Sequence, residues 1–114
     1  MKVTALGEVI ERLERDLGLA SNELAQALGV SPTTLARWRA DETYPQHKAR
    51  QALSQLLELS RHLQETFTTP EDTVTWLHAA SRYLGGLAPV DAIRVGRFDR
   101  VEAALEALDS GIFV

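Results

Sequence analysis

Apolar residues recur at steps of three and four along most of the chain, which is the period of a helix with one buried face. The first stripe consists of Val3, Leu6, Ile10, Leu13 and Leu17, with Gly18 directly after it. A helix predicted to begin at Pro45 carries the longest stripe, which consists of Ala49, Leu53, Leu56, Ser60, Leu63 and Phe67. Apolar and polar residues nowhere alternate over enough positions to predict a strand. The pattern therefore predicts an all-α fold.

Signals for helix starts and ends divide this pattern into short segments. We expect Ser21 to cap a helix over residues 22–28 that Gly29 ends, and Ser31-Pro32 to open the next helix. Thr69-Pro70 predicts another start, with a helix running to about Ala80. The remaining signals are a turn at Gly85-Gly86, a short helix between Pro89 and Gly96, and a last helix around Val101, Leu105 and Leu108 that Gly111 ends.

Composition removes several classes of protein. Of the 114 residues, 45% are hydrophobic and 25% are charged, which is typical of a folded globular chain. The chain contains 0 cysteines, which excludes disulfides and thiolate metal sites. Its apolar runs fall short of the roughly 20 residues needed to cross a membrane. Because the sequence opens Met1-Lys2-Val3-Thr4, without the pattern of a signal peptide, we expect a cytoplasmic location.

The net charge of −4 is unevenly distributed. Residues 1–62 contain 8 basic and 8 acidic side chains, whereas residues 63–114 contain 4 basic and 8 acidic ones. Together with the cap signal near Thr68, this shift predicts two units, residues 1–68 and residues 69–114.

Residues 21–39 carry the most specific pattern in the chain. A small residue, Ala25, stands where two short helices must approach closely, and Gly29 can adopt the positive φ of a tight turn. The inward positions on both helices are apolar: Leu24, Leu28, Val30, Leu35 and Trp38. This segment resembles the helix-turn-helix of phage-repressor-like (Xre-type) regulators.

In a helix-turn-helix, the second helix enters the DNA major groove by its N-terminal part. Since Leu35 and Trp38 face the core, the opposite face would present Thr33, Thr34 and Arg37 to operator DNA. Arginine can contact guanine through two hydrogen bonds, and Ser31 at the helix N-terminus suits a phosphate. The predicted DNA-binding residues are Ser31, Thr33, Thr34, Arg37 and Arg39. Helical corners of this shape also exist in proteins that do not bind DNA. Because one weakly basic helix-turn-helix would bind DNA poorly, DNA binding would require a homodimer with two of them.

A DNA-binding unit does not require residues 70–114. In order, this half contains Trp76-Leu77, Leu84-Gly85-Gly86, Pro89, Gly96, and a segment from Val101 to Gly111 followed by Ile112-Phe113-Val114. This order resembles the toxin-binding domain of Xre/MbcA/ParS-type antitoxins. The resemblance implies a type II toxin–antitoxin system whose partner is a RES-domain toxin that attacks cellular NAD. It also implies that the C-terminal end of the antitoxin occludes the active-site entrance of the toxin.

The resemblance carries a set of expected toxin-binding positions onto this chain. Pro89 and Gly96 are expected to form turns of the scaffold. A tryptophan such as Trp76 is more often a core residue than a residue in contact with a partner. The apolar tail exposes hydrophobic surface unless the toxin, or the chain's own core, covers it. The expected positions are Trp76, Gly85, Gly86, Gly111, Ile112, Phe113 and Val114.

Other chemistry finds little support in the sequence. His47, His62 and His78 are too far apart to predict a local metal site, so we expect no metal or cofactor. The residues form no nucleophile–base pattern, which predicts a protein that is not an enzyme. The helix after Pro45 lacks the basic polar face of a membrane-surface helix, so it suits core or dimer packing better. The alternative to an antitoxin is a dimeric helix-turn-helix repressor without a toxin partner.

Overall fold

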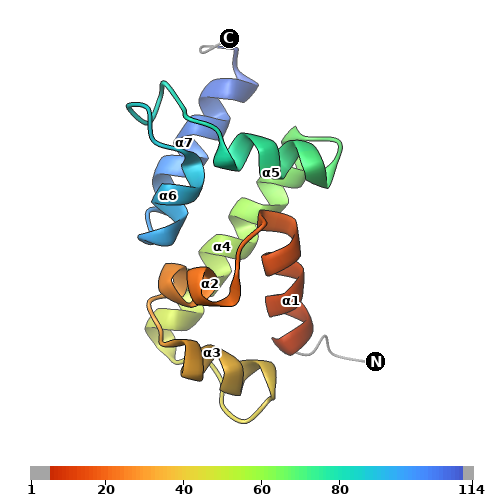
Figure 1. The fold of residues 1–114 in the computed structure, drawn as a ribbon, viewed down its shortest axis with the longest axis vertical. Coiled ribbons are helices and arrows are strands. Elements are labelled where there is room, and N and C mark those ends of the chain that lie inside the picture. Colours follow the sequence, from red (N-terminus) through yellow and green to blue (C-terminus); the bar gives the residue numbers. More distant parts are fainter. Residues whose placement is uncertain (1–5, 112–114) are drawn as a thin grey trace.

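The structure, a computed structural model, describes residues 6–111. Over these residues the chain forms helices and no strand, which confirms the all-α prediction. Figure 1 shows their arrangement. The helices are α1 (Leu6–Leu17), α2 (Ser21–Leu28), α3 (Pro32–Arg39), α4 (His47–Thr66), α5 (Pro70–His78), α6 (Pro89–Arg94) and α7 (Phe98–Asp109).

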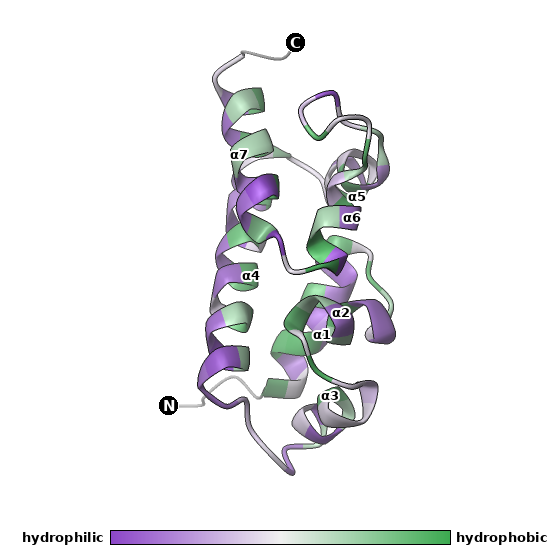
Figure 2. Ribbon diagram, turned by 90° about the vertical axis from the view of Figure 1, so that its left-hand side faces the viewer, coloured by the Kyte–Doolittle hydropathy of each residue, from purple (hydrophilic) through white to green (hydrophobic). Residues whose placement is uncertain are grey.

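The long helix α4 connects the two halves of the molecule. Helices α1 and α2 from the N-terminal half and α7 from the C-terminal half all pack on it. In Figure 2 the hydrophilic positions of α4 lie mainly on its outer side. Leu59, which the predicted stripe omits, is fully buried together with Leu56. The apolar face of α4 is wider than one stripe because the helix packs against neighbours from both halves.

One hydrophobic core extends through both halves. The same cluster of buried side chains includes Ile10 and Leu24 near the N-terminus and Leu77, Ile93 and Leu105 near the C-terminus. The division into residues 1–68 and 69–114 stays a prediction, since α4 supplies core residues to each side. None of the helices within residues 6–111 is both long and apolar enough to span a membrane.

Two predicted helix starts are wrong by one or two residues. Ala20, not Ser21, is the N-cap of α2, because the Glu23 carboxylate accepts the Ala20 N–H at 2.9 Å. The Ser21 hydroxyl instead donates to Glu14 at 2.6 Å. Helix α4 begins at His47 and not at Pro45, because Gln46 still has extended backbone angles.

Candidate functional sites

Helices α2 and α3 and the turn at Gly29 between them form as the sequence predicts. Gly29 ends α2 with a φ of 74°, and its N–H donates to the Gln26 carbonyl at 3.1 Å. The Val30 N–H donates to the Ala25 carbonyl at 3.0 Å, which completes a Schellman ending. Leu35 and Trp38 on α3 are 1% and 2% exposed. Because these two side chains face the core, the opposite side of α3 faces away from it.

Four of the five predicted DNA-binding residues lie along α3, with Ser31 at its N-cap, Thr33 and Thr34 in its first turn and Arg37 in its last turn. Ser31 caps the helix by accepting the Thr34 N–H at 3.1 Å, and its hydroxyl lies 3.0 Å from the Thr34 hydroxyl. Thr33 and Arg37 are exposed and one turn apart. Within residues 6–111, no ion pair or hydrogen bond holds the Arg37 guanidinium. Helix α3 therefore presents hydroxyls near its N-terminus and, one turn after Thr33, the Arg37 cation.

Arg39 lies apart from these four residues. Its guanidinium is 2.7 Å from the Glu14 carboxylate and 3.2 Å from the Ser21 hydroxyl. The hydrogen bond to Glu14 raises the pKa of Arg39. Burial acts to raise the pKa of Glu14, but the hydrogen bonds from Arg39 and Ser21 and the charge of Arg39 together lower it. Arg39 thus ties the end of α3 to α1 and α2. This role could not be predicted from local sequence patterns, because the partners Glu14 and Ser21 lie 25 and 18 residues from Arg39 along the chain.

The expected toxin-binding positions are spread over the C-terminal half. Trp76 is partly buried, and its ring packs against the ring of Phe67 in a tilted arrangement, with 5.7 Å between the ring centres. Gly85 and Gly86 have φ values of 69° and 93° in the loop before α6, and Gly111 has 75° after α7. These glycines shape turns. Ile112, Phe113 and Val114 lie outside the described residues, so their toxin-binding role stays a prediction.

An ion-pair cluster joins α6 to the helix-turn-helix. Arg94 is 2.6 Å from the Glu23 carboxylate on α2 and 2.7 Å from Asp91 on its own helix. At the end of α6, Gly96 approaches the Ala27 carbonyl so closely that a Cβ would lie 3.5 Å from it. The C-terminal half is therefore packed directly on α2 in the N-terminal half.

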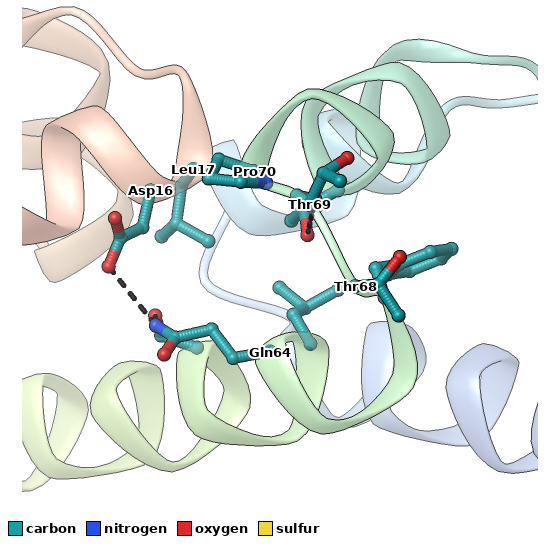
Figure 3. A pocket seen from close by; sticks show the side chains of 10 residues that line it. Asp16, Leu17, Gln64, Thr68, Thr69 and Pro70 are labelled. Carbon is teal, nitrogen blue, oxygen red and sulfur yellow. Dashed lines mark hydrogen bonds between the residues drawn. The ribbon is translucent and has the colours of Figure 1, made fainter.

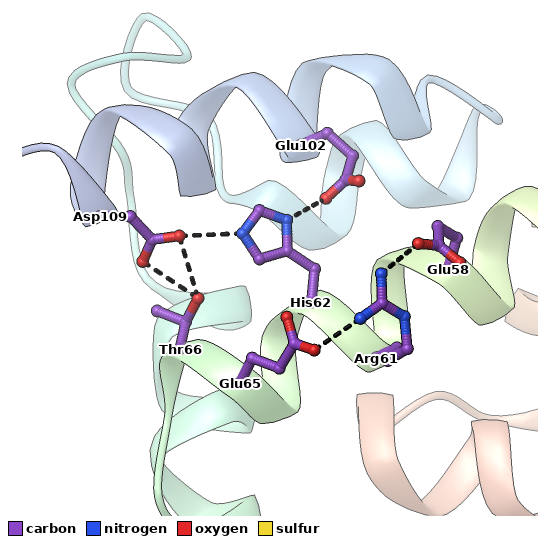
Figure 4. Close-up of polar contacts among 7 residues, drawn as sticks. All are labelled: Glu58, Arg61, His62, Glu65, Thr66, Glu102 and Asp109. Carbon is purple, nitrogen blue, oxygen red and sulfur yellow. Dashed lines mark hydrogen bonds and ion pairs between the residues drawn. The ribbon is translucent and has the colours of Figure 1, made fainter.

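His62 holds α4 to α7 through both of its ring nitrogens. Nδ1 is 2.7 Å from Glu102 and Nε2 is 2.9 Å from Asp109, as Figure 4 shows. Asp109 also accepts the Thr66 hydroxyl at 3.1 Å, and Arg61 is paired separately with Glu58 and Glu65. Because both ring nitrogens face carboxylates, this geometry favours the doubly protonated ring. The pKa of His62 is raised, mainly by its hydrogen bond to Asp109, and that of Asp109 is lowered by the same bond.

The His62 contacts predict a specific pH dependence of stability. Their contribution is complete below the ordinary histidine pKa of 6.5 and is lost as pH rises through the raised pKa of folded His62. The contribution of Asp109 has the opposite sign and is lost as strong acid protonates it. Urea unfolding should therefore show that His62→Gln costs more stability at pH 6 than at pH 9. His47→Gln, at an exposed histidine, is the control, and an equal cost of His62→Gln at both pH values would contradict the assignment.

A pocket of about 280 Å³ lies between α1, α4 and the start of α5. Figure 3 shows the Gln64 amide of α4 reaching across it to Asp16 of α1, at 3.1 Å. The buried hydroxyl of Thr73 donates to the Thr69 carbonyl at 3.4 Å. The polar groups of the pocket thus satisfy one another. Within residues 6–111, no cluster of His, Asp or Glu is arranged to hold a metal ion.

Comparisons with known proteins agree with this architecture. The family described as the antitoxin Xre/MbcA/ParS C-terminal toxin-binding domain matches residues 62–111. The mycobacterial cidal antitoxin MbcA of Mycobacterium tuberculosis, and that of Mycobacterium bovis, are 31% identical over 114 residues, with all of each chain covered. A probable mycobacterial cidal antitoxin of M. tuberculosis, Rv3188, is 31% identical over 94% of this chain and 90% of its own.

A solved structure extends the likeness to three dimensions. A chain in the crystal structure of the M. tuberculosis MbcT–MbcA toxin–antitoxin complex superposes with a TM-score of 0.71 at 29% identity. The superposition covers 98% of this chain and 100% of that one. The molecule is thus an all-helical protein of the antitoxin class. The chain belongs to the Xre/MbcA/ParS antitoxin family, and it is similar over its full length to the MbcA members of that family.

Proposed function

We propose that this chain is a cytoplasmic, non-enzymatic antitoxin that neutralises a cognate RES-domain, NAD-degrading toxin. The observation that carries the proposal is similarity over the full length to an antitoxin crystallised with its toxin. The toxin would bind residues 62–111 and the tail beyond them, and the antitoxin would act by occluding the active site of the toxin. Direct occlusion requires no catalytic group on the antitoxin.

We also propose that the chain represses its own operon. The support is the well-formed helix-turn-helix, with Ser31, Thr33, Thr34 and Arg37 on the outer face of α3. Two such heads, as in a homodimer, would read half-sites about one helical turn apart. The same observation favours the second candidate function, a dimeric repressor with no toxin partner.

Co-purification with the product of the adjacent gene separates these two functions. The chain should form a stable complex with that product and inhibit its consumption of NAD. A chain that binds its own promoter but neither binds nor inhibits the adjacent product would be a repressor only.

The tail should contribute more to neutralisation than to folding. Removing Ile112–Val114 deletes three apolar side chains, and burial of one large apolar side chain contributes about 1.5–3 kcal/mol. We therefore expect about tenfold or more weaker toxin binding, measured by calorimetry, at an unchanged melting temperature. A full-length control carries serine at all three positions and should behave like the deletion. An equal loss of toxin binding and of stability would instead assign the tail to the chain's own core.

A further inference from the structure

The described C-terminal half has an apolar groove that its own side chains leave open. It lies between the loop before α6, the outer face of α6 and the first turn of α7. Figure 1 shows that α6 and this loop are well away from α3. The groove is lined by Leu84, Leu87, Ala92, Val95, Arg97 and Arg100, with the α6 carboxylate of Asp91 at its edge.

The exposure of two side chains in this groove is unusual for a folded chain. Leu87 is 60% exposed and Val95 is 67% exposed. Among the described residues, Tyr44 is the other large hydrophobic side chain that is more than half exposed. Two of these three side chains line the same groove, so their exposure is gathered on one concave surface rather than scattered.

The charged groups around the groove favour a ligand that carries a negative charge. Asp91 is already bound, by Arg94 at 2.7 Å and by the Ala88 N–H at 3.1 Å. Arg97 forms an ion pair with Asp99 at 3.1 Å. Arg100 is exposed, and within residues 6–111 no acidic side chain pairs with it. The groove therefore presents an apolar floor beside an unneutralised cation, although the C-terminal half as a whole is acidic.

We propose that this groove is an anchor for the partner toxin, which inserts an apolar side chain flanked by a carboxylate. This inference rests on the proposed function, and it adds a second contact surface to the tail. The groove lies entirely within residues 62–111, the segment that matches the toxin-binding family. Binding there would cover Leu87 and Val95 and pair Arg100 with an acid.

A second copy of this chain fits the groove less well. In a twofold dimer, the same surface patch meets itself across the axis. Such a pairing through the groove would place two unneutralised Arg100 cations in one interface, while the carboxylate at its edge, Asp91, is already held by Arg94. Like charges that meet at an interface disfavour the complex. The toxin is therefore the occupant that the charges support.

The experiment measures affinity for the purified product of the adjacent gene by calorimetry. Val95→Asp and Leu87→Asp, both at exposed positions, should each weaken binding about tenfold or more. Arg100→Glu should slow association and reduce its dependence on salt. Leu57→Asp is the matched control, because Leu57 is a 40% exposed leucine on α4 outside the groove. It should change affinity less than about twofold, a small part of one tenfold step.

Three other outcomes would overturn the proposal. Groove variants that bind like the wild-type chain, or no worse than Leu57→Asp, would exclude the groove from the interface. A change in the mass of the free chain on light scattering, with unchanged toxin affinity, would assign the groove to a second copy. A wild-type chain that fails to bind the adjacent product would refute the proposed function, and the groove proposal with it. Circular dichroism spectra and melting temperatures identical to wild type show that each variant is folded.

Discussion

Placing a side chain at Gly7 should destabilise the whole protein and displace α3. Gly7 is buried on α1, and a Cβ built there would lie 2.6 Å from the Arg39 carbonyl oxygen at the end of α3. The obstructing atom belongs to the backbone, so no side-chain rotation relieves the clash. Either α1 or α3 must shift, and overpacking of this kind costs about 1–3 kcal/mol or more.

Helix propensity acts in the opposite direction at this position. Alanine is better than glycine within a helix by about 1 kcal/mol, so an unpacked helix would gain stability from Gly7→Ala. Urea unfolding should show a net loss for Gly7→Ala and a larger loss for Gly7→Val. Glu8→Ala, at the exposed neighbouring position, is the control and should remain within about 0.5 kcal/mol of wild type. Stabilisation by Gly7→Ala would show that α1 does not pack closely against α3.

Replacing Arg37 with alanine should weaken binding to the specific DNA site and relax the preference for guanine at the position that Arg37 contacts. Arg37 projects from the outer face of α3 and, among residues 6–111, has no carboxylate to hold it. A lost two-bond contact to guanine costs about 1–3 kcal/mol at the specific site, or about 5- to 150-fold in affinity. Fluorescence anisotropy with the promoter fragment upstream of its own gene measures the effect, with a scrambled fragment for comparison.

A second arginine makes this test reciprocal. Arg100→Ala removes the same charge from the groove beside α6, far from α3, and should leave promoter affinity within about twofold. In turn, Arg37→Ala should leave toxin affinity unchanged. Equal effects of both substitutions on promoter binding would mean that general charge, and not a base contact, attracts the DNA.

Local signals in the sequence predicted much of the fold, because they act within one helical turn. Ser31 and Thr69 each accept an N–H three residues later, at 3.1 Å, as their cap patterns predicted. The error at the start of α4 has a local cause also: Pro45 precedes Gln46, whose backbone is still extended. Ser21 does not cap α2, because its hydroxyl donates to Glu14 on α1 and because Glu23, three residues after Ala20, accepts the Ala20 N–H.

The candidate sites depend on contacts that no local pattern encodes. The face of α3 followed from its helical period, so Thr33 and Arg37 could be placed from the sequence. The ion pair between Arg39 and Glu14 joins residues 25 positions apart, so it could not be predicted from the sequence. The groove was missed for a related reason. Leu87 and Val95 look like ordinary apolar residues until the packing of α6 on α2 and α7 shows that nothing within residues 6–111 covers them.

Growth rescue in cells tests the central claim most directly. The product of the adjacent gene is expressed from an inducible promoter, with and without this chain, and colony formation is counted. If the chain is the cognate antitoxin, the adjacent product alone should stop growth, and co-expression should restore it. The Arg37→Ala variant, supplied from a promoter that it does not control, should rescue equally well. Continued growth arrest despite abundant, folded chain would contradict the account.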